Sequence, residues 1–150
     1  MFRQLKFVLT DEHNADYQLL SDRLDDYYYE RFGEVSLQYK PYNVDVGDVL
    51  IGYVNAAPVC CGALRMHDKK TAELKRVYVS PSCRRQGLAR RVVAALEELA
   101  AHNGAHTILV ETGAEMADAT ALYKSLGYSL IENFGPYAGD EMCVCLKKTL

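Results

Sequence analysis

The chain has 150 residues, of which 49% are hydrophobic and 25% are charged, and its formal net charge at pH 7 is −3. These values predict one globular domain, residues 1–150, that is large enough to bury a core. Because nucleic-acid binding normally brings a basic excess, the negative net charge argues against that class of function. No apolar run approaches the roughly 20 residues of a membrane span. The first residues also lack a signal-peptide pattern, so we expect a cytoplasmic protein without a membrane partner.

The N-terminal part of the sequence predicts a strand, a helix and an irregular segment. Residues 2–9 alternate between apolar and polar side chains, as a strand does. Residues 16–32 carry leucine and tyrosine at helical spacing, and Gly33 is placed to end that helix. Residues 34–48 contain several turn-forming residues, so no regular element is predicted there.

The middle of the chain predicts three strands and a long helix. Strands over 49–54 and 59–65 flank a turn at 55–58 and form a hairpin, and a further strand follows over 73–79. After a loop, apolar residues recur every three or four positions through 88–99. This spacing predicts an amphipathic helix with one buried stripe.

The C-terminal part adds a strand over 106–111, a short helix over 116–126 and two strands over 128–131 and 142–146. The complete order, β-α-β-β-β-α-β-α-β-β, predicts an α/β fold in which helices cover both faces of a mixed sheet.

The cysteines predict neither disulfides nor a metal site. Five of them in a chain expected in the cytoplasm indicate reduced thiols. Cys143 and Cys145 alternate on one predicted strand, which places both on the same face. A structural zinc site needs about four ligands, and no second pair of suitable spacing accompanies these two. We therefore interpret them as small buried hydrophobic residues.

The loop before the long helix carries the strongest chemical signal. It reads Arg-Arg-Gln-Gly-Leu-Ala over 84–89 and delivers the helix N-terminus with its unsatisfied backbone N–H groups. Gly87 lets the backbone approach an anion closely, and the arginines add charge-assisted hydrogen bonds. A phosphate or pyrophosphate fits such a site, although a basic turn that caps a helix has the same pattern. The P-loop and dinucleotide-binding patterns are absent from the sequence, which excludes those two nucleotide folds.

Six short motifs follow one another along the chain: CGALR (61–65), ELKRVYVSP (73–81), the loop 84–89, ETG (111–113), ALYKSLGY (121–128) and FGPY (134–137). In this order and spacing they resemble the GNAT superfamily of acetyl-CoA-dependent N-acetyltransferases. The resemblance implies a single-domain GNAT fold, in which a mostly antiparallel central sheet splays at the strand that binds the cofactor. It also implies acetyl-CoA as the co-substrate.

The resemblance further implies a set of cofactor-binding residues. In the family, the loop holds the pyrophosphate, the preceding strand pairs its backbone with the pantetheine arm, and a tyrosine lies near the thioester sulfur. Arg85 and Ala89 depart from the commonest pattern, since glycine is frequent at both positions. Met116 stands where many members carry an asparagine, so no cofactor contact is carried over there. The implied residues are Val77, Tyr78, Val79, Arg84, Arg85, Gln86, Gly87, Leu88, Ala89 and Tyr123.

Acetyl transfer to an amine needs an acceptor for the ammonium proton, a donor to the oxyanion and a proton for the thiolate. Tyr123 suits the last role because a phenol stays protonated at neutral pH, although it also fits the apolar stripe of its helix. A backbone N–H of Val77 or Tyr78 is the expected oxyanion donor. Glu73 is the predicted base. An ion pair with a neighbouring arginine is the alternative for Glu73, and Glu111 on the adjacent strand is its rival.

The acceptor is expected near the first helix, which combines carboxylates with tyrosines. Such a surface attracts a cationic amine, or it simply faces solvent opposite a tyrosine core stripe. We expect direct transfer, in a ternary complex, to a primary amine of a small molecule or peptide. Three alternatives stay open: a non-catalytic acyl-CoA-binding module, a transferase of longer acyl groups, and an interaction protein that uses the tyrosine-rich helix. Because single GNAT domains often pair, a homodimer is compatible with the resemblance.

Overall fold

The structure of the chain is a computed structural model that describes residues 4–150. The elements are β1 (Lys6–Thr10), α1 (Ala15–Phe32), η1 (Gly33–Asn43), β2 (Asp48–Val54), β3 (Ala57–Met66), β4 (Thr71–Val79), η2 (Pro81–Cys83), α2 (Leu88–His102), β5 (Thr107–Gly113), α3 (Ala117–Ser125), β6 (Ser129–Ile131), η3 (Gly135–Tyr137) and β7 (Cys143–Thr149). The order of strands and α-helices is the one that the sequence predicts. The first strand was expected over 2–9, and residues 2 and 3 of that range lie outside the described residues.

One seven-stranded sheet forms the centre of the molecule, in the order β1-β2-β3-β4-β5-β7-β6. The β4–β5 pair is parallel, and the other neighbouring strands are antiparallel. The β2–β3 hairpin turns at Asn55 and Ala56, whose φ angles of 50° and 66° give the left-handed two-residue turn that matches the twist of a hairpin. The mixed, mostly antiparallel sheet that the resemblance implies is therefore confirmed.

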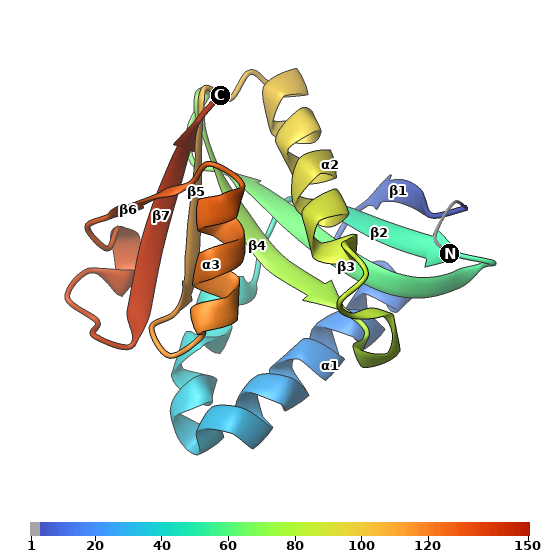
Figure 1. Cartoon of the computed structure of the whole chain (residues 1–150), viewed down its shortest axis with the longest axis horizontal. Helices are drawn as coiled ribbons and strands as arrows, with labels where there is room; N and C mark the ends of the chain where they lie inside the picture. The colour runs from blue at the N-terminus through green and yellow to red at the C-terminus, as the bar shows by residue number, and fades with distance from the viewer. Residues whose placement is uncertain (1–3) are drawn as a thin grey trace.

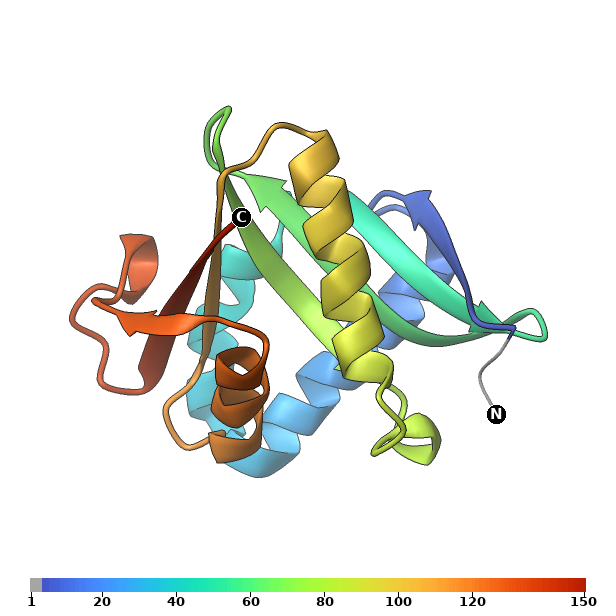
Figure 2. The ribbon, with the colours of Figure 1, turned by 45° about the horizontal axis from the view of Figure 1, so that its top comes forward.

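Helices cover both faces of this sheet, with α1 on one side and α2 on the other (Figures 1 and 2). The apolar stripe of α1 packs with Ile51 and Cys61 in one core cluster. The stripe of α2 packs with Leu64 and Leu74 in a second cluster, which also takes in Tyr123 of α3. Among the described residues, none of the helices has the length and apolar character that crossing a membrane requires.

The segment predicted to be irregular contains a run of 3₁₀-helix, η1, over Gly33–Asn43. Its contacts come from distant parts of the chain: the Tyr39 hydroxyl donates to the Asp140 carboxylate at 2.7 Å, and the ring of Tyr42 meets Tyr137 edge-on. Tyr137 also packs with Cys143 and Cys145 in a third small core cluster. Local sequence carries no sign of these long-range contacts, which explains why the prediction missed η1.

Candidate active site

β4 and β5 separate half-way along their length. They pair from Thr71–Leu74 to 107–110, and beyond Leu74 the residues of β4 pair only with β3. A bulge at Arg76, whose φ is 56°, accompanies a register shift between β3 and β4. Because a bulge bends its strand and increases the local twist, it turns the second half of β4 away from β5. The splayed strand pair that the resemblance implies is present.

Helix α1 holds this bulge in place. The Arg76 guanidinium donates to the Ser21 carbonyl and to the Asp25 carboxylate, at 2.8 Å in each case. A left-handed backbone costs a non-glycine residue about 1–2 kcal/mol, and hydrogen bonds to charged groups, worth about 1.5–3 kcal/mol each, offset that cost. Asp25 is thereby committed to Arg76, so one of the carboxylates expected to attract an amine has a structural partner instead.

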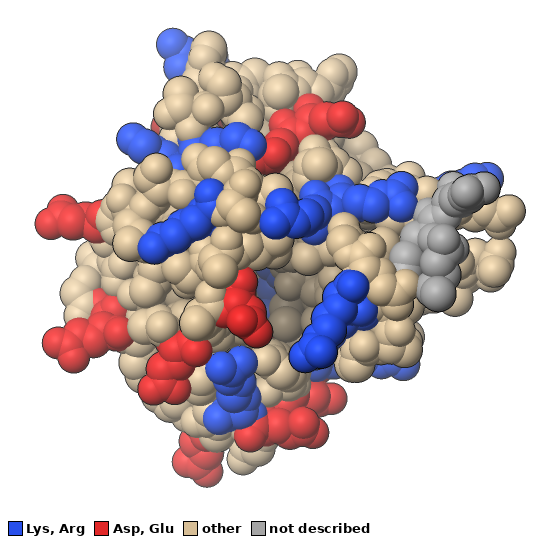
Figure 3. Space-filling model, in the orientation of Figure 1, with Lys and Arg blue, Asp and Glu red and all other residues tan. Residues whose placement is uncertain are grey.

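A cavity of about 510 Å³ occupies the gap between the two strands. β4 and β5 form its walls, and α1, α2, α3, η1 and η3 contribute further lining residues. Figure 3 shows a hollow in the surface here, with basic side chains above and to the right of it and acidic side chains to its left. Basic and acidic side chains therefore both lie at the rim of the cavity.

The second half of β4 turns backbone polar groups into the cavity. The Ser80 N–H donates to a carbonyl of β3 at 2.8 Å. Since successive N–H groups alternate along a strand, those of Val77 and Val79 point to the unpaired edge, whereas that of Tyr78 points to β3. Arg84 Nε donates to the Val79 carbonyl at 3.0 Å. The edge is suited to an extended ligand that forms backbone hydrogen bonds as a strand does.

The loop that follows is shaped by two left-handed residues, Arg85 with φ 63° and Gly87 with φ 80°. Gly87 is the N-cap of α2, and no side chain of the described residues caps this helix. The first N–H groups of α2 are thus suited to an anion. The Leu88 side chain is buried in the core, so this residue offers only its backbone, whereas Ala89 lines the cavity.

The other loop side chains lie outside the core. The Arg84 guanidinium covers the rings of Tyr27 and Tyr78, with 5.4 Å and 5.7 Å to the ring centroids. Arg85 and Gln86 are exposed. Arg84 is therefore fixed against α1 and β4 at the mouth of the cavity, while the next two side chains can reach a charged ligand from solvent.

Tyr123 of α3 lines the cavity and is also part of the core. Its side chain is 6% exposed, and its ring meets that of Tyr128 edge-on with the centroids 5.5 Å apart. Burial raises the pKa of the Tyr123 hydroxyl, and electrostatic interaction with the Tyr28 and Glu111 side chains adds to the rise. The hydroxyl consequently stays protonated at neutral pH. Both sequence interpretations of this residue, core aromatic and proton donor, fit its position.

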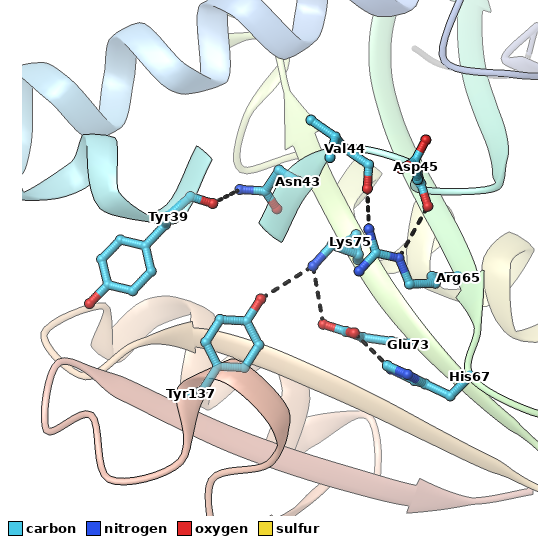
Figure 4. A network of polar contacts seen from close by, with 9 residues as sticks. All are labelled: Tyr39, Asn43, Val44, Asp45, Arg65, His67, Glu73, Lys75 and Tyr137. Atoms are coloured by element: carbon cyan, nitrogen blue, oxygen red, sulfur yellow. Dashed lines mark hydrogen bonds and ion pairs between the residues drawn. The ribbon is translucent and has the colours of Figure 1, made fainter. Parts of the chain in front are cut away.

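Glu73 is buried and lies in a chain of polar contacts on the β4 wall (Figure 4). Its Oε1 is 2.8 Å from His67 Nε2, and its Oε2 is 3.3 Å from Lys75 Nζ. Lys75 Nζ also donates to the Tyr137 hydroxyl at 3.2 Å. Burial lowers the pKa of Lys75, and the Glu73 carboxylate opposes that change. The side chains that contact the Glu73 carboxylate are therefore a lysine and a histidine, not the arginine that the sequence suggested.

Glu111 lines the cavity from the β5 wall. Burial raises its pKa to about 7; the Lys75 ammonium opposes this change and the Glu73 carboxylate reinforces it. A carboxyl group with this pKa exchanges its proton readily near neutral pH. Glu111 thus has the property expected of a general base, while both oxygens of Glu73 already have partners.

Three members of this network were not singled out from the sequence: His67, Lys75 and Tyr137. One signal was available, because residues two apart on a strand share a face and Lys75 follows Glu73 by two positions. His67 comes from the turn after β3 and Tyr137 from the 3₁₀-helix η3, and only the tertiary fold brings them together. The ring of Phe134 meets the rings of both His67 and Tyr137 edge-on.

The sequence matches the Acetyltransferase (GNAT) family over residues 6–128. The chain belongs to this family. An IAA acetyltransferase from Azospirillum brasilense is 31% identical to this GNAT chain over 102 residues, which is 67% of each protein. A solved structure of a candidate acyl-CoA N-acyltransferase from Klebsiella pneumoniae is 30% identical, covers 98% of both chains and superposes with a TM-score of 0.82.

A more distant structure shares the GNAT fold. The acetyltransferase from Elizabethkingia anophelis, solved with acetyl-CoA bound, has a TM-score of 0.74, 17% identity and 99% coverage of both chains. The family resemblance drawn from the six motifs is therefore confirmed, and the protein is an acyltransferase enzyme of the GNAT type.

Proposed function

We propose that this GNAT enzyme transfers an acetyl group from acetyl-CoA to a primary amine, by direct attack in a ternary complex. The observation that carries the proposal is the open edge of β4, which runs from the loop before α2 into the cavity that Tyr123 lines. A pyrophosphate at the helix N-terminus and a pantetheine arm along the edge deliver the thioester to Tyr123. Acetyl-CoA bound in a protein of the same fold supports this choice of co-substrate.

The cofactor contacts fall into two groups. Arg85, Gln86 and the backbone of 87–89 bind the pyrophosphate, and Arg84 stays against the strand as a wall of the site. Val77 and Val79 pair with the pantetheine arm. Because the Val77 N–H points to the open edge and that of Tyr78 does not, Val77 is the oxyanion donor in this proposal.

The chemical step needs two proton transfers. Glu111 accepts the proton of the attacking amine, because its carboxyl group lines the cavity and has a pKa of about 7. Glu73, the base predicted from the sequence, positions Lys75 and His67 through its two oxygens. Tyr123 donates a proton to the coenzyme A thiolate as the tetrahedral intermediate collapses.

The test is thiol release from acetyl-CoA with a panel of primary amines, with the acetylated product identified by mass. Tyr123→Phe should lower kcat about 10- to 100-fold and leave acetyl-CoA affinity unchanged, since only the proton donor is lost. Tyr29→Phe, at an exposed tyrosine of α1, is the matched control. Acetyl-CoA binding without thiol release to any amine would favour the non-catalytic module instead. Faster turnover with a longer acyl-CoA than with acetyl-CoA would favour a transferase of longer acyl groups.

A further inference from the structure

Lys75 is a buried cation at the wall of the cavity. Its side chain is 3% exposed, yet the residue belongs to the cavity lining. An ammonium has three N–H donors, and two of them are directed to Glu73 and Tyr137. The third N–H has no acceptor among the described residues. Burying a cationic donor is costly unless its hydrogen bonds are completed, so this position calls for an acceptor from a ligand.

Tyr137 places a second donor beside the first. Its hydroxyl oxygen accepts from Lys75 Nζ at 3.2 Å, which leaves the hydroxyl hydrogen for another acceptor. No residue in the described part of the chain receives that hydrogen. The side chain is 3% exposed, and its ring is fixed edge-on between Tyr42 and Phe134. Two adjacent donors, one of them cationic, thus lie together in the cavity.

The two walls of the cavity have unlike charges at this end. The β4 wall presents the Lys75 ammonium, and the β5 wall presents Glu111. The Glu73 carboxylate opposes the lowering of the Lys75 pKa by burial and so favours the ammonium, without occupying all of its donors. A ligand that carries one positive and one negative group satisfies both walls, whereas a simple amine satisfies only Glu111.

We infer that Lys75 and Tyr137 bind a carboxylate of the acceptor, so that the acceptor is a free amino acid. The inference rests on the proposed function and names the substrate class of the same site. The carboxylate accepts one hydrogen bond from Lys75 Nζ and one from the Tyr137 hydroxyl, and the amino group lies toward Glu111 and the thioester.

Amino acids and their carboxamides provide the direct comparison, because the two have nearly the same shape and the amide lacks the negative charge that meets Lys75. The experiment measures kcat/KM with acetyl-CoA for the 20 common amino acids and the matching amides, with the α- and side-chain amines distinguished by product mass spectra. We expect the best acid to exceed its amide about tenfold or more. Lys75→Met should remove that preference and lower kcat/KM for the acid about 10- to 100-fold, with less than threefold loss on the amide.

Two further variants guard against a merely structural effect. Lys75→Met leaves the buried Glu73 without its ammonium partner and thus carries a risk to folding. Tyr137→Phe keeps the ring and removes only the hydroxyl, so it should lower kcat/KM about tenfold for the acid alone. Lys147→Met, at an exposed lysine of β7, should change neither substrate.

The outcomes separate the inference from the function on which it rests. Turnover of amides or simple amines as fast as acids, or equal losses on both substrates in Tyr137→Phe, overturns the carboxylate site and keeps the acetyltransferase. No turnover of any amine by protein that binds acetyl-CoA overturns both.

Discussion

The two ends of the cavity are built from different parts of the chain. In the proposed complex, the contacts at the cofactor end are mainly backbone groups of β4 and of the first turn of α2, contributed by one continuous stretch, residues 77–89. At the proposed acceptor end, the cavity is lined by the side chains of Glu73, Lys75, Glu111 and Tyr137, from two strands and the 3₁₀-helix η3. The comparison teaches that, in the proposed complex, backbone geometry binds the co-substrate, whereas side-chain charge selects the acceptor. Substitutions at the two ends should therefore have separable effects.

The largest effect is expected at the cofactor end. Gly87→Glu introduces a carboxylate where we place the pyrophosphate. It also places a side chain on a residue whose φ is 80°, which strains the backbone. Like charge and strain together should reduce acetyl-CoA affinity about a thousandfold or more. Calorimetric titration measures this. Gly139→Glu is the control, because Gly139 has φ 76°, equal space for a side chain and a position outside the loop. If Gly87→Glu binds acetyl-CoA as tightly as the wild type does, the pyrophosphate does not bind at the N-terminus of α2.

At the acceptor end, the pH profile separates the two carboxylates. Because Glu111 must be deprotonated to accept a proton, kcat/KM for the amine should rise with pH through about 7. Glu111→Gln should abolish this rise and lower kcat about a hundredfold at pH 8. Glu73→Gln should retain a rise with pH, since Glu73 acts through its neighbours. If kcat/KM no longer rises with pH in Glu73→Gln but still rises in Glu111→Gln, then Glu73 is the general base.

A smaller effect is expected where α1 meets β4, between the two ends. Arg76→Met removes the cation that pairs with Asp25 and leaves the left-handed backbone without compensation. We expect the free energy of unfolding to fall by about 2 kcal/mol, measured by urea denaturation. Arg23→Met, at an exposed arginine of the same helix, should stay within about 0.5 kcal/mol of wild type. If Arg76→Met lowers the free energy of unfolding by less than about 0.5 kcal/mol, then α1 does not stabilise the bulge.

The sequence was most informative where function depends on local structure. Gly87 and the stripe of α2 predict a loop and helix start from neighbouring residues, and the strands follow from alternation and turn residues. The acceptor end could not be predicted in the same way. Glu73 was recognised, but its partner His67 lies 6 positions away in a turn, and Tyr137, which accepts from Lys75, is 62 positions from that lysine. No periodicity in the sequence relates these residues. The pairing of Arg76 with Asp25 across 51 positions is likewise a product of tertiary packing. Cytoplasmic location and a homodimer remain predictions.

If acetyl-CoA binds along the unpaired edge of β4 as proposed, the stability of the fold also depends on the supply of acetyl-CoA. The parallel pair β4–β5 consists of four residue pairs, so the sheet is incomplete where its two halves diverge. In the proposed complex, the pantetheine arm takes the place of the missing strand and adds hydrogen bonds that the protein alone does not make. A ligand that binds only the folded state adds about 2.7 kcal/mol of stability at 100 times its Kd. Abundant acetyl-CoA would then protect the enzyme from unfolding, and scarcity would expose it to turnover by proteases.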